Sequence, residues 1–250
     1  MTDHILVERQ GAIQIIRMNR PHKKNALTRA MYAKMSKTLA EGDADPAIRV
    51  HVFLGVPGAF SSGNDLADFM VVATGGDGGT EVWDFLMALA KVEKPMVSGV
   101  DGIAVGIGTT LNLHCDLTFA TPRTVFRTPF VDLGLVPEAG SSLLAPRILG
   151  QQAAFALLGL GEGFSAERAK AAGLIYEVVE EAALEASVLA AAGQIAAKPP
   201  QALKIARNLM RGSRDDLVAR IGEDSEHFRE RLKSGEARAA LTAFMTRKKA

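Results

Sequence analysis

The chain contains a single cysteine, Cys115, among its 250 residues. No internal disulfide can form, so we expect a protein of a reducing compartment, the cytoplasm. The N-terminal Met-Thr-Asp-His-Ile-Leu lacks the layout of a signal peptide. No apolar run reaches the roughly 18 residues that a membrane-spanning helix needs. We therefore expect no contact with a membrane.

A surplus of either charge is also missing. The 29 Lys and Arg residues balance 28 Asp and Glu residues, for a formal net charge of +1. Proteins that bind nucleic acids or anionic membranes concentrate basic side chains. Nucleic acid is therefore not an expected partner. With 48% hydrophobic and 23% charged residues, the composition is that of an ordinary globular protein with a large core.

Several catalytic motifs are absent. The five histidines show no His-x-x-x-His spacing and one cysteine allows no Cys-x-x-Cys pair, so no metal site is predicted. No Gly-x-Ser-x-Gly sequence offers a nucleophilic serine, and no Gly-x-Gly-x-x-Gly opens a helix to hold a dinucleotide. The glycine run at residues 75–79 follows no strand and precedes no Lys-Ser/Thr pair. It is interpreted as a mobile loop rather than a phosphate loop.

Short apolar runs alternate with helical patterns up to about residue 180, which predicts an α/β core with largely parallel strands. The expected strands are residues 5–8 and 12–18, joined as a hairpin, then 50–54, 96–100, 117–120, 124–127 and 174–179. The expected helices are residues 28–42, 83–92, 139–149, 151–158 and 165–173. From residue 182 the pattern is almost wholly helical, with a break at residues 198–200. This remainder is interpreted as an appendage or an oligomer surface, with a boundary between residues 1–195 and 196–250.

Two turns that contain glycine each follow a buried strand. One comprises residues 61–65, Ser-Ser-Gly-Asn-Asp, and the other comprises Gly106, Ile107 and Gly108. Backbone N–H groups at the start of a helix have no partner inside it. If the two strands lie side by side, one N–H from each turn can point at the same oxygen. Such a pair stabilises an enolate or a tetrahedral anion.

Glu138 is the candidate general base. It lies in Gly134-Leu-Val-Pro-Glu-Ala-Gly140, a loop just before an expected helix. A carboxylate there can take up and return a proton. A second interpretation stays open from the residues alone, in which Glu138 is a first-turn carboxylate that complements the helix dipole.

Four sequence blocks resemble the crotonase, or enoyl-CoA hydratase/isomerase, family in their order and spacing. They are Asn19-Arg-Pro-His-Lys-Lys-Asn-Ala-Leu27, Phe60-Ser-Ser-Gly-Asn-Asp-Leu66, Asp101-Gly-Ile-Ala-Val-Gly-Ile-Gly108 and Gly134-Leu-Val-Pro-Glu-Ala-Gly140. The resemblance covers nearly the full length. It implies a spiral of stacked ββα turns with a C-terminal α-helical trimerisation region. It also implies an acyl-CoA substrate, no metal or redox cofactor, and a homotrimer or a dimer of trimers.

Carried over to this sequence, the resemblance assigns the oxyanion N–H donors to Asn64 and Ile107. It places residues 23–26 beside the adenine and phosphates of CoA, with help from two basic residues at the C-terminus. The substrate-binding residues that it implies are Lys23, Lys24, Ala26, Ser62, Gly63, Asp65, Leu66, Gly106, Phe130, Arg247 and Lys248. Residues 70–80 are expected to line or cover the acyl pocket.

Departures from the family pattern decide the predicted reaction. Hydratases of the family carry glutamates at the positions of Thr110 and Phe130, and neither is present here. Glu138 matches the single base of the Δ3-Δ2-enoyl-CoA isomerases, where one carboxylate moves a proton from C2 to C4. The chain is therefore predicted to be such an isomerase, with the pKa of Glu138 raised by an apolar wall that includes Phe130.

Two alternatives remain open. One is another crotonase-type reaction on an acyl-CoA, including hydration. The other is a scaffold without catalysis that binds CoA esters or RNA. The sequence leaves open the acyl chain length, the cis or trans preference, and the choice between a trimer and a hexamer.

Overall fold

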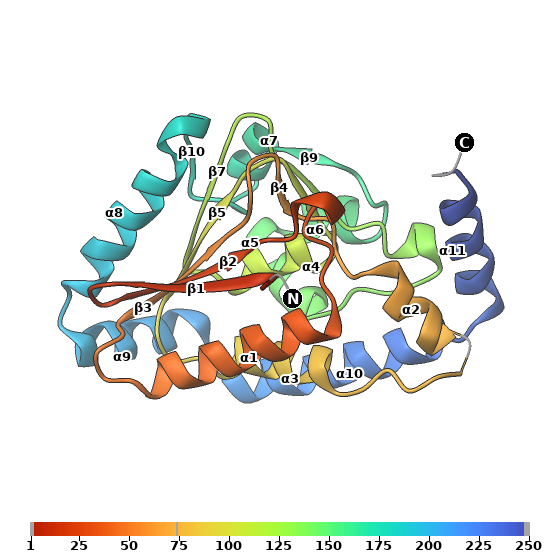
Figure 1. The fold of residues 1–250 in the computed structure, drawn as a ribbon, viewed down its shortest axis with the longest axis horizontal. Coiled ribbons are helices and arrows are strands. Elements are labelled where there is room, and N and C mark those ends of the chain that lie inside the picture. Colours follow the sequence, from red (N-terminus) through yellow and green to blue (C-terminus); the bar gives the residue numbers. More distant parts are fainter. Residues whose placement is uncertain (1–2, 74, 248–250) are drawn as a thin grey trace.

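The computed structural model describes residues 3–73 and 75–247, which form two sheets surrounded by helices (Figure 1). The larger sheet has the strand order β1-β2-β3-β5-β7-β10 and the smaller sheet the order β4-β6-β8-β9. The strands of the larger sheet are β1 Ile5–Gln10, β2 Ile13–Met18, β3 Val50–Leu54, β5 Met96–Val100, β7 Leu117–Ala120 and β10 Glu177–Val178. Those of the smaller sheet are β4 Ala59–Ser61, β6 Ile103–Val105, β8 Val125–Arg127 and β9 Phe164–Ser165.

The chain alternates between the two sheets as a spiral. β3, β5 and β7 join the larger sheet, and β4, β6 and β8, which follow them in turn, join the smaller sheet. Within each sheet these neighbours pair in parallel. The hairpin of β1 and β2 and the pair of β8 and β9 are antiparallel. The expected α/β fold with largely parallel strands is confirmed.

The burial of β3 and β5 on both faces explains why their sequences are almost continuously apolar. Both strands are buried at every residue, because helices cover both faces of the larger sheet. On one face, Val52 and Val97 pack against Val188 of α8 (Leu184–Ala196). On the other, Phe53 and Met96 join the main core with α1 (Arg29–Ala44) and α3 (Glu81–Lys91).

Helix α1 begins where its capping residue predicts. The Thr28 hydroxyl accepts the backbone N–H of Met31, which satisfies one of the free donors of the first turn. Met31, Met35 and Leu39 are buried on one face, as expected from their spacing. These side chains belong to the same hydrophobic core as Phe53 of β3 and Met96 of β5.

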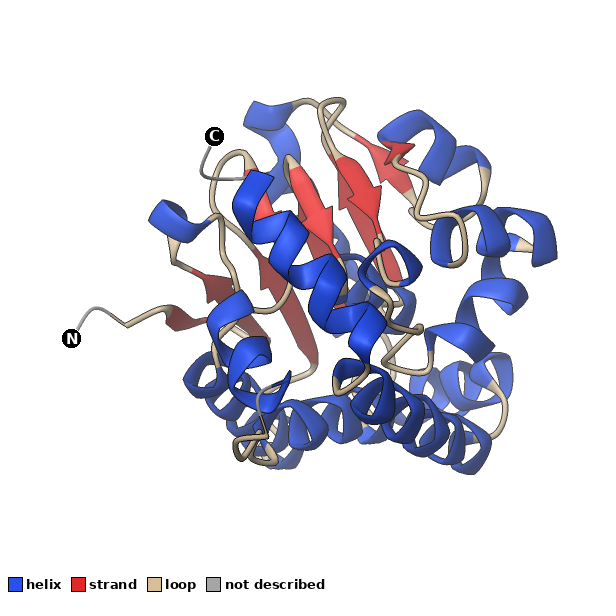
Figure 2. Ribbon diagram, turned by 90° about the vertical axis from the view of Figure 1, so that its right-hand side faces the viewer, coloured by secondary structure: helices blue, strands red, loops and turns tan. Residues whose placement is uncertain are grey.

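The remaining helices are α2 Leu66–Ala73, α4 Ile107–Thr110, α5 Ser141–Leu149, α6 Gln151–Leu158, α7 Ala166–Ala171, α9 Pro200–Arg211, α10 Arg214–Leu232 and α11 Gly235–Arg247. Helix α10 packs against α3 (Figure 1). A layer of helices lies below the strands (Figure 2). Ile221 and Leu232 of α10, with Leu241 of α11, belong to the main hydrophobic core. The C-terminal helices therefore pack on the α/β spiral, and the boundary at residues 195 and 196 stays a prediction.

Candidate active site

The two glycine turns lie side by side because β4 and β6 are parallel neighbours. A Cβ added to Gly106 would lie 4.0 Å from the Cα of Gly63, and one added to Gly63 would lie 3.0 Å from the carbonyl oxygen of Val105. Both glycines have positive φ, 90° at Gly63 and 57° at Gly106. This left-handed backbone and the close approach both favour glycine.

Each turn contains one of the two predicted N–H donors, Asn64 in the first and Ile107 in the second. The peptides on both sides of Asn64 bond to Leu27, since the N–H of Leu27 donates to the Gly63 oxygen (2.8 Å) and that of Asp65 to the Leu27 oxygen (2.9 Å). The N–H of Asn64 itself has no partner in the part of the chain that the structure describes. Ile107 opens α4, so its N–H has no partner inside the helix.

Glu138 is a buried carboxyl, with 5% of its surface exposed. Its Oε1 accepts a hydrogen bond from the Thr110 hydroxyl at 2.6 Å. Burial raises the pKa of Glu138 to about 7, the Thr110 hydrogen bond opposes this shift, and the charge of Asp224 adds to it. The expected rise in pKa is thus present, and its main cause is burial. Phe130 lines the other cavity, described below, so its part in the shift stays a prediction.

The turn after Glu138 keeps it out of the following helix. Ala139 and Gly140 have φ values of 60° and 69°, so α5 begins at Ser141 rather than at Ala139 as predicted. The ring Nε2 of His114 lies 2.8 Å from the Ala139 oxygen and fixes this turn. Burial lowers the pKa of His114 to about 4, so the ring is neutral near pH 7. No acidic residue occupies the first turn of α5, and the helix-dipole interpretation of Glu138 is not supported.

Asp224 reaches the same turn from α10. It is 7% exposed, and its Oδ1 accepts the Ser142 hydroxyl at 2.6 Å. Burial raises the pKa of Asp224 as well, although the Ser142 hydrogen bond and Arg220 oppose the shift. Sequence reasoning missed this residue, because one aspartate in a helix rich in charged side chains carries no distinguishing pattern.

Two cavities lie on either side of Asn64, in the turn at residues 61–65. The first, of about 550 Å³, is called the lysine cavity here. The predicted residues that line it are Lys23, Lys24, Ala26, Ser62, Gly63, Asp65, Leu66, Gly106 and Phe130. The second, of about 390 Å³, is called the glutamate cavity and is lined by Glu138, Tyr32, Leu86 and residues 76–79 among others. Asn64, Phe69 and Phe228 border both cavities.

The structure therefore brings most predicted site residues together. Glu138 and Asn64 share the glutamate cavity, and residues 76–79 line it as well. That this cavity holds the acyl chain stays a prediction. The Ile107 side chain is buried, so only its backbone is a candidate for binding. The two C-terminal residues are not placed in the site: Arg247 ends α11, its side chain is not described, and Lys248 lies outside the described residues.

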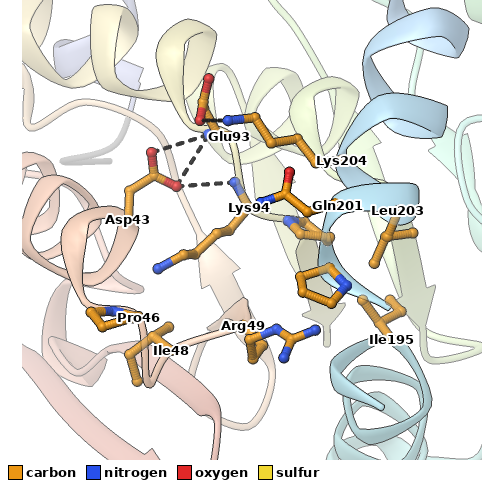
Figure 3. Close-up of a pocket in the computed structure, with 12 residues that line it drawn as sticks. Asp43, Pro46, Ile48, Arg49, Glu93, Lys94, Ile195, Gln201, Leu203 and Lys204 are labelled. Atoms are coloured by element: carbon orange, nitrogen blue, oxygen red, sulfur yellow. Dashed lines mark hydrogen bonds and ion pairs between the residues drawn. The ribbon is translucent and has the colours of Figure 1, made fainter. Parts of the chain in front are cut away.

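A third cavity, of about 310 Å³, shares no lining residue with these two (Figure 3). Asp43 accepts the backbone N–H groups of Glu93 and Lys94, and the Glu93 carboxylate pairs with Lys204 of α9. The Lys94 ammonium donates to two backbone carbonyls. Asp43 and Lys94 are thus satisfied by backbone groups, and the ion pair of Glu93 with Lys204 holds α9 against the spiral.

The described ranges contain no group of three or more His, Cys, Asp and Glu side chains placed to hold a metal ion. In the same ranges, no helix combines the length and apolar character needed to cross a bilayer. The cofactor prediction stays a prediction.

The chain matches the family described as "Enoyl-CoA hydratase/isomerase" over residues 8–250. It is 35% identical over 250 residues to "Enoyl-CoA delta isomerase 2" of Rattus norvegicus, covering 98% of this chain and 64% of that protein. The chain therefore spans somewhat less than two thirds of that relative. It is also 28% identical to "2,3-dehydroadipyl-CoA hydratase" of Escherichia coli strain K12, over 98% of this chain and 96% of that protein.

Solved structures agree with this similarity. The solved structure described as "Structure of Pseudomonas aeruginosa OdaA" superimposes with a TM-score of 0.92 at 42% sequence identity, covering 98% of this chain and 99% of that one. The fold of the spiral is thus shared with that protein over almost the whole of both chains.

Proposed function

The chain belongs to the enoyl-CoA hydratase/isomerase family, and on that premise we propose that it is a Δ3-Δ2-enoyl-CoA isomerase with Glu138 as its only proton carrier. The observation that carries the proposal is a buried carboxyl with a pKa of about 7 in a cavity bordered by Asn64. A general base works best when its pKa lies near the working pH, since it must both accept and release a proton.

The proposed reaction moves one proton and no other atom. Ionised Glu138 removes a proton from C2 of a 3-enoyl-CoA, and the electron pair of that C–H bond shifts toward the thioester oxygen. The N–H groups of Asn64 and Ile107 stabilise the resulting dienolate. Protonated Glu138 then delivers its proton to C4, and the double bond re-forms between C2 and C3.

The surroundings of Glu138 favour isomerisation over hydration. Adding water needs one group to activate the water and another to protonate C2. Thr110 holds Oε1 of Glu138 by donating a hydrogen bond, which leaves Oε2 for the substrate. Two other carboxylates line the glutamate cavity. Asp68 accepts the backbone N–H of Arg29, and Asp77 accepts that of Gly79. Phe130 supplies no proton.

Lys23 and Lys24 are proposed to bind the phosphates of CoA at the lysine cavity. The loop that carries them is fixed by the buried Asn25, whose carboxamide donates to the backbone oxygens of Met18, Ala59 and Phe60. The thioester would then lie at the junction of the two cavities, where Asn64 borders both. Contributions from Arg247 and Lys248 stay predictions.

Self-association is proposed through α9. Unlike a usual surface helix, α9 exposes apolar side chains to solvent and buries a charged one. Its Ile205, Leu209 and Met210 are 60%, 80% and 80% exposed. The charged Arg207 on its other side is buried against Asp116. An exposed apolar face of this kind marks a protein contact. It supports the homotrimer, or dimer of trimers, that the family resemblance implies.

The test compares wild type with Glu138→Gln, which keeps the size and removes the charge. We expect isomerisation of a 3-enoyl-CoA to fall on the order of 10²–10⁴-fold in the variant. Hydration of the matching 2-enoyl-CoA, followed on the same preparations, should be slight in both. Isomerisation that survives in Glu138→Gln contradicts the shuttle. Efficient hydration by wild type would favour the alternative, a hydratase, which similarity to the E. coli hydratase keeps in view.

A further inference from the structure

Tyr32 is a buried tyrosine whose hydroxyl reaches the glutamate cavity. It lies on the inner face of α1, is 1% exposed, and packs against Phe85 of α3 with the ring centroids 5.4 Å apart. Its hydroxyl donates to Oδ1 of Asn64 at 2.5 Å. A buried tyrosine hydroxyl needs a partner. Here that partner is the side chain of a residue already assigned to the oxyanion site.

The direction of this hydrogen bond is fixed by protonation. Burial raises the pKa of Tyr32 well above its usual range, and the negative charge of Glu138 adds to the shift. The phenol therefore stays protonated throughout the working pH range and acts as the donor. Asn64 accepts through its carbonyl oxygen, which leaves its amide group as the remaining side-chain donor.

Asn64 is held at three points. The peptides before and after it bond to Leu27, and the Tyr32 hydroxyl holds its carboxamide. An asparagine side chain without such a partner readily bonds to backbone N–H groups one or two residues further on. Engaging Oδ1 with Tyr32 removes this competition at the turn that carries the free N–H.

We propose that Tyr32 is a positioning residue of the oxyanion site, which fixes the Asn64 carboxamide and through it the direction of the Asn64 backbone N–H. The inference rests on the proposed function, since it assumes that this N–H binds the thioester oxygen. Donors of an oxyanion site are effective because they are held in place before the charge develops. Tyr32 contacts Asn64 rather than the reacting atoms, so its contribution passes entirely through Asn64.

A double-mutant cycle tests this dependence. Tyr32→Phe keeps the ring packed on Phe85 and removes only the hydroxyl, while Asn64→Ala removes the carboxamide and keeps the backbone N–H. We expect Tyr32→Phe to lower kcat for isomerisation about tenfold with little change in KM. In the Asn64→Ala background the same change should have no further effect. An equal loss in both backgrounds, or no loss in either, overturns the proposal.

A spectroscopic measurement separates this inference from the reaction. The carbonyl stretch of hexanoyl-CoA labelled with ¹³C at the thioester carbon would be recorded by infrared difference spectroscopy on the bound complex. We expect a shift to lower frequency in wild type, and a smaller shift in both Tyr32→Phe and Asn64→Ala. Because hexanoyl-CoA is saturated, the reading is valid even if wild type shows no isomerase activity, a result that would remove only the proposed function. An unchanged shift in Tyr32→Phe overturns the positioning role.

The chain offers a matched control. Tyr176, the other of its two tyrosines, is 56% exposed and packs edge-on against Phe119, away from both cavities. Tyr176→Phe should leave the kinetics and the carbonyl band unchanged. Thermal unfolding of all variants shows whether Tyr32→Phe acts on the site or on the fold. A lowered melting temperature with an unaltered carbonyl band would count against the proposal.

Discussion

The two halves of the proposed site use different chemical groups, backbone amides in one and a carboxyl side chain in the other. The proposed oxyanion half consists of backbone N–H groups at the ends of two neighbouring strands, in turns that contain Gly63 and Gly106. The base half is one side chain, Glu138, whose pKa depends on burial, Thr110 and Asp224. A backbone N–H group keeps its proton throughout a reaction, which suits a hydrogen-bond donor. A general base must gain and lose a proton, and the pKa of a carboxyl side chain can be set for this by its surroundings.

Apart from Glu138→Gln, the largest effect should come from a substitution in the backbone half. Gly106 has φ 57° and ψ −121°, a conformation that strains any residue with a Cβ, although a Cβ would meet no atom closer than 4.0 Å. Gly106→Ala should therefore shift the turn and lower kcat on the order of 10²–10³-fold. Steady-state kinetics on a 3-enoyl-CoA would measure it. Full activity would mean that the adjacent Ile107 N–H is not required.

A moderate effect is expected in the base half from Thr110→Val. The Thr110 hydrogen bond stabilises the ionised carboxylate, so its loss should raise the pKa of Glu138 further. Less of the base is then ionised at pH 6, and kcat there should fall about threefold to tenfold. The acid limb of the pH profile should move to higher pH.

Thr109→Val is the matched control for this change. The Thr109 hydroxyl is equally buried but donates to the Ala104 oxygen, away from Glu138. Thr109→Val should lower the free energy of unfolding without moving the acid limb of the pH profile. If both variants move the acid limb alike, Thr110 does not act through the charge of Glu138.

The smallest effect should come from Asp224→Asn. Its negative charge raises the pKa of Glu138, so neutralising it should lower that pKa and move the acid limb to lower pH. The asparagine oxygen can still accept the Ser142 hydroxyl, so the turn should persist. A shift opposite to that of Thr110→Val, measured under the same conditions, would separate charge from hydrogen bonding. A shift in the same direction would contradict this account.

The parts of the site that sequence could predict are local. Glycine spacing and the preceding buried strands predicted both turns, because turn geometry depends on a few consecutive residues. The loop around Glu138 was recognised for the same reason. The exact start of α5 was wrong by two residues, since the left-handed Ala139 has no sequence signature.

The parts that sequence could not predict depend on long-range contacts. Thr110 was interpreted only as the absence of a glutamate, yet its hydroxyl meets Glu138 across 28 residues of chain. Tyr32 belongs to an ordinary apolar helix face, and its partner Asn64 is 32 residues away. Asp224 and Ser142 are separated by 82 residues. Neither periodicity nor motif spacing reports which side chains meet at such separations.

The residues of α10 that line the glutamate cavity also have a consequence for folding during synthesis. Phe228 and Leu232 line this cavity together with Leu27 and Tyr32, which lie about two hundred residues earlier in the chain. Contacts between such distant segments need a long loop to close, and they form after the local ones. A ribosome must release almost the whole chain before this pocket can be closed. Until then the apolar wall is exposed to solvent, so a nascent chain is open to aggregation at the place where the finished enzyme would hold its substrate.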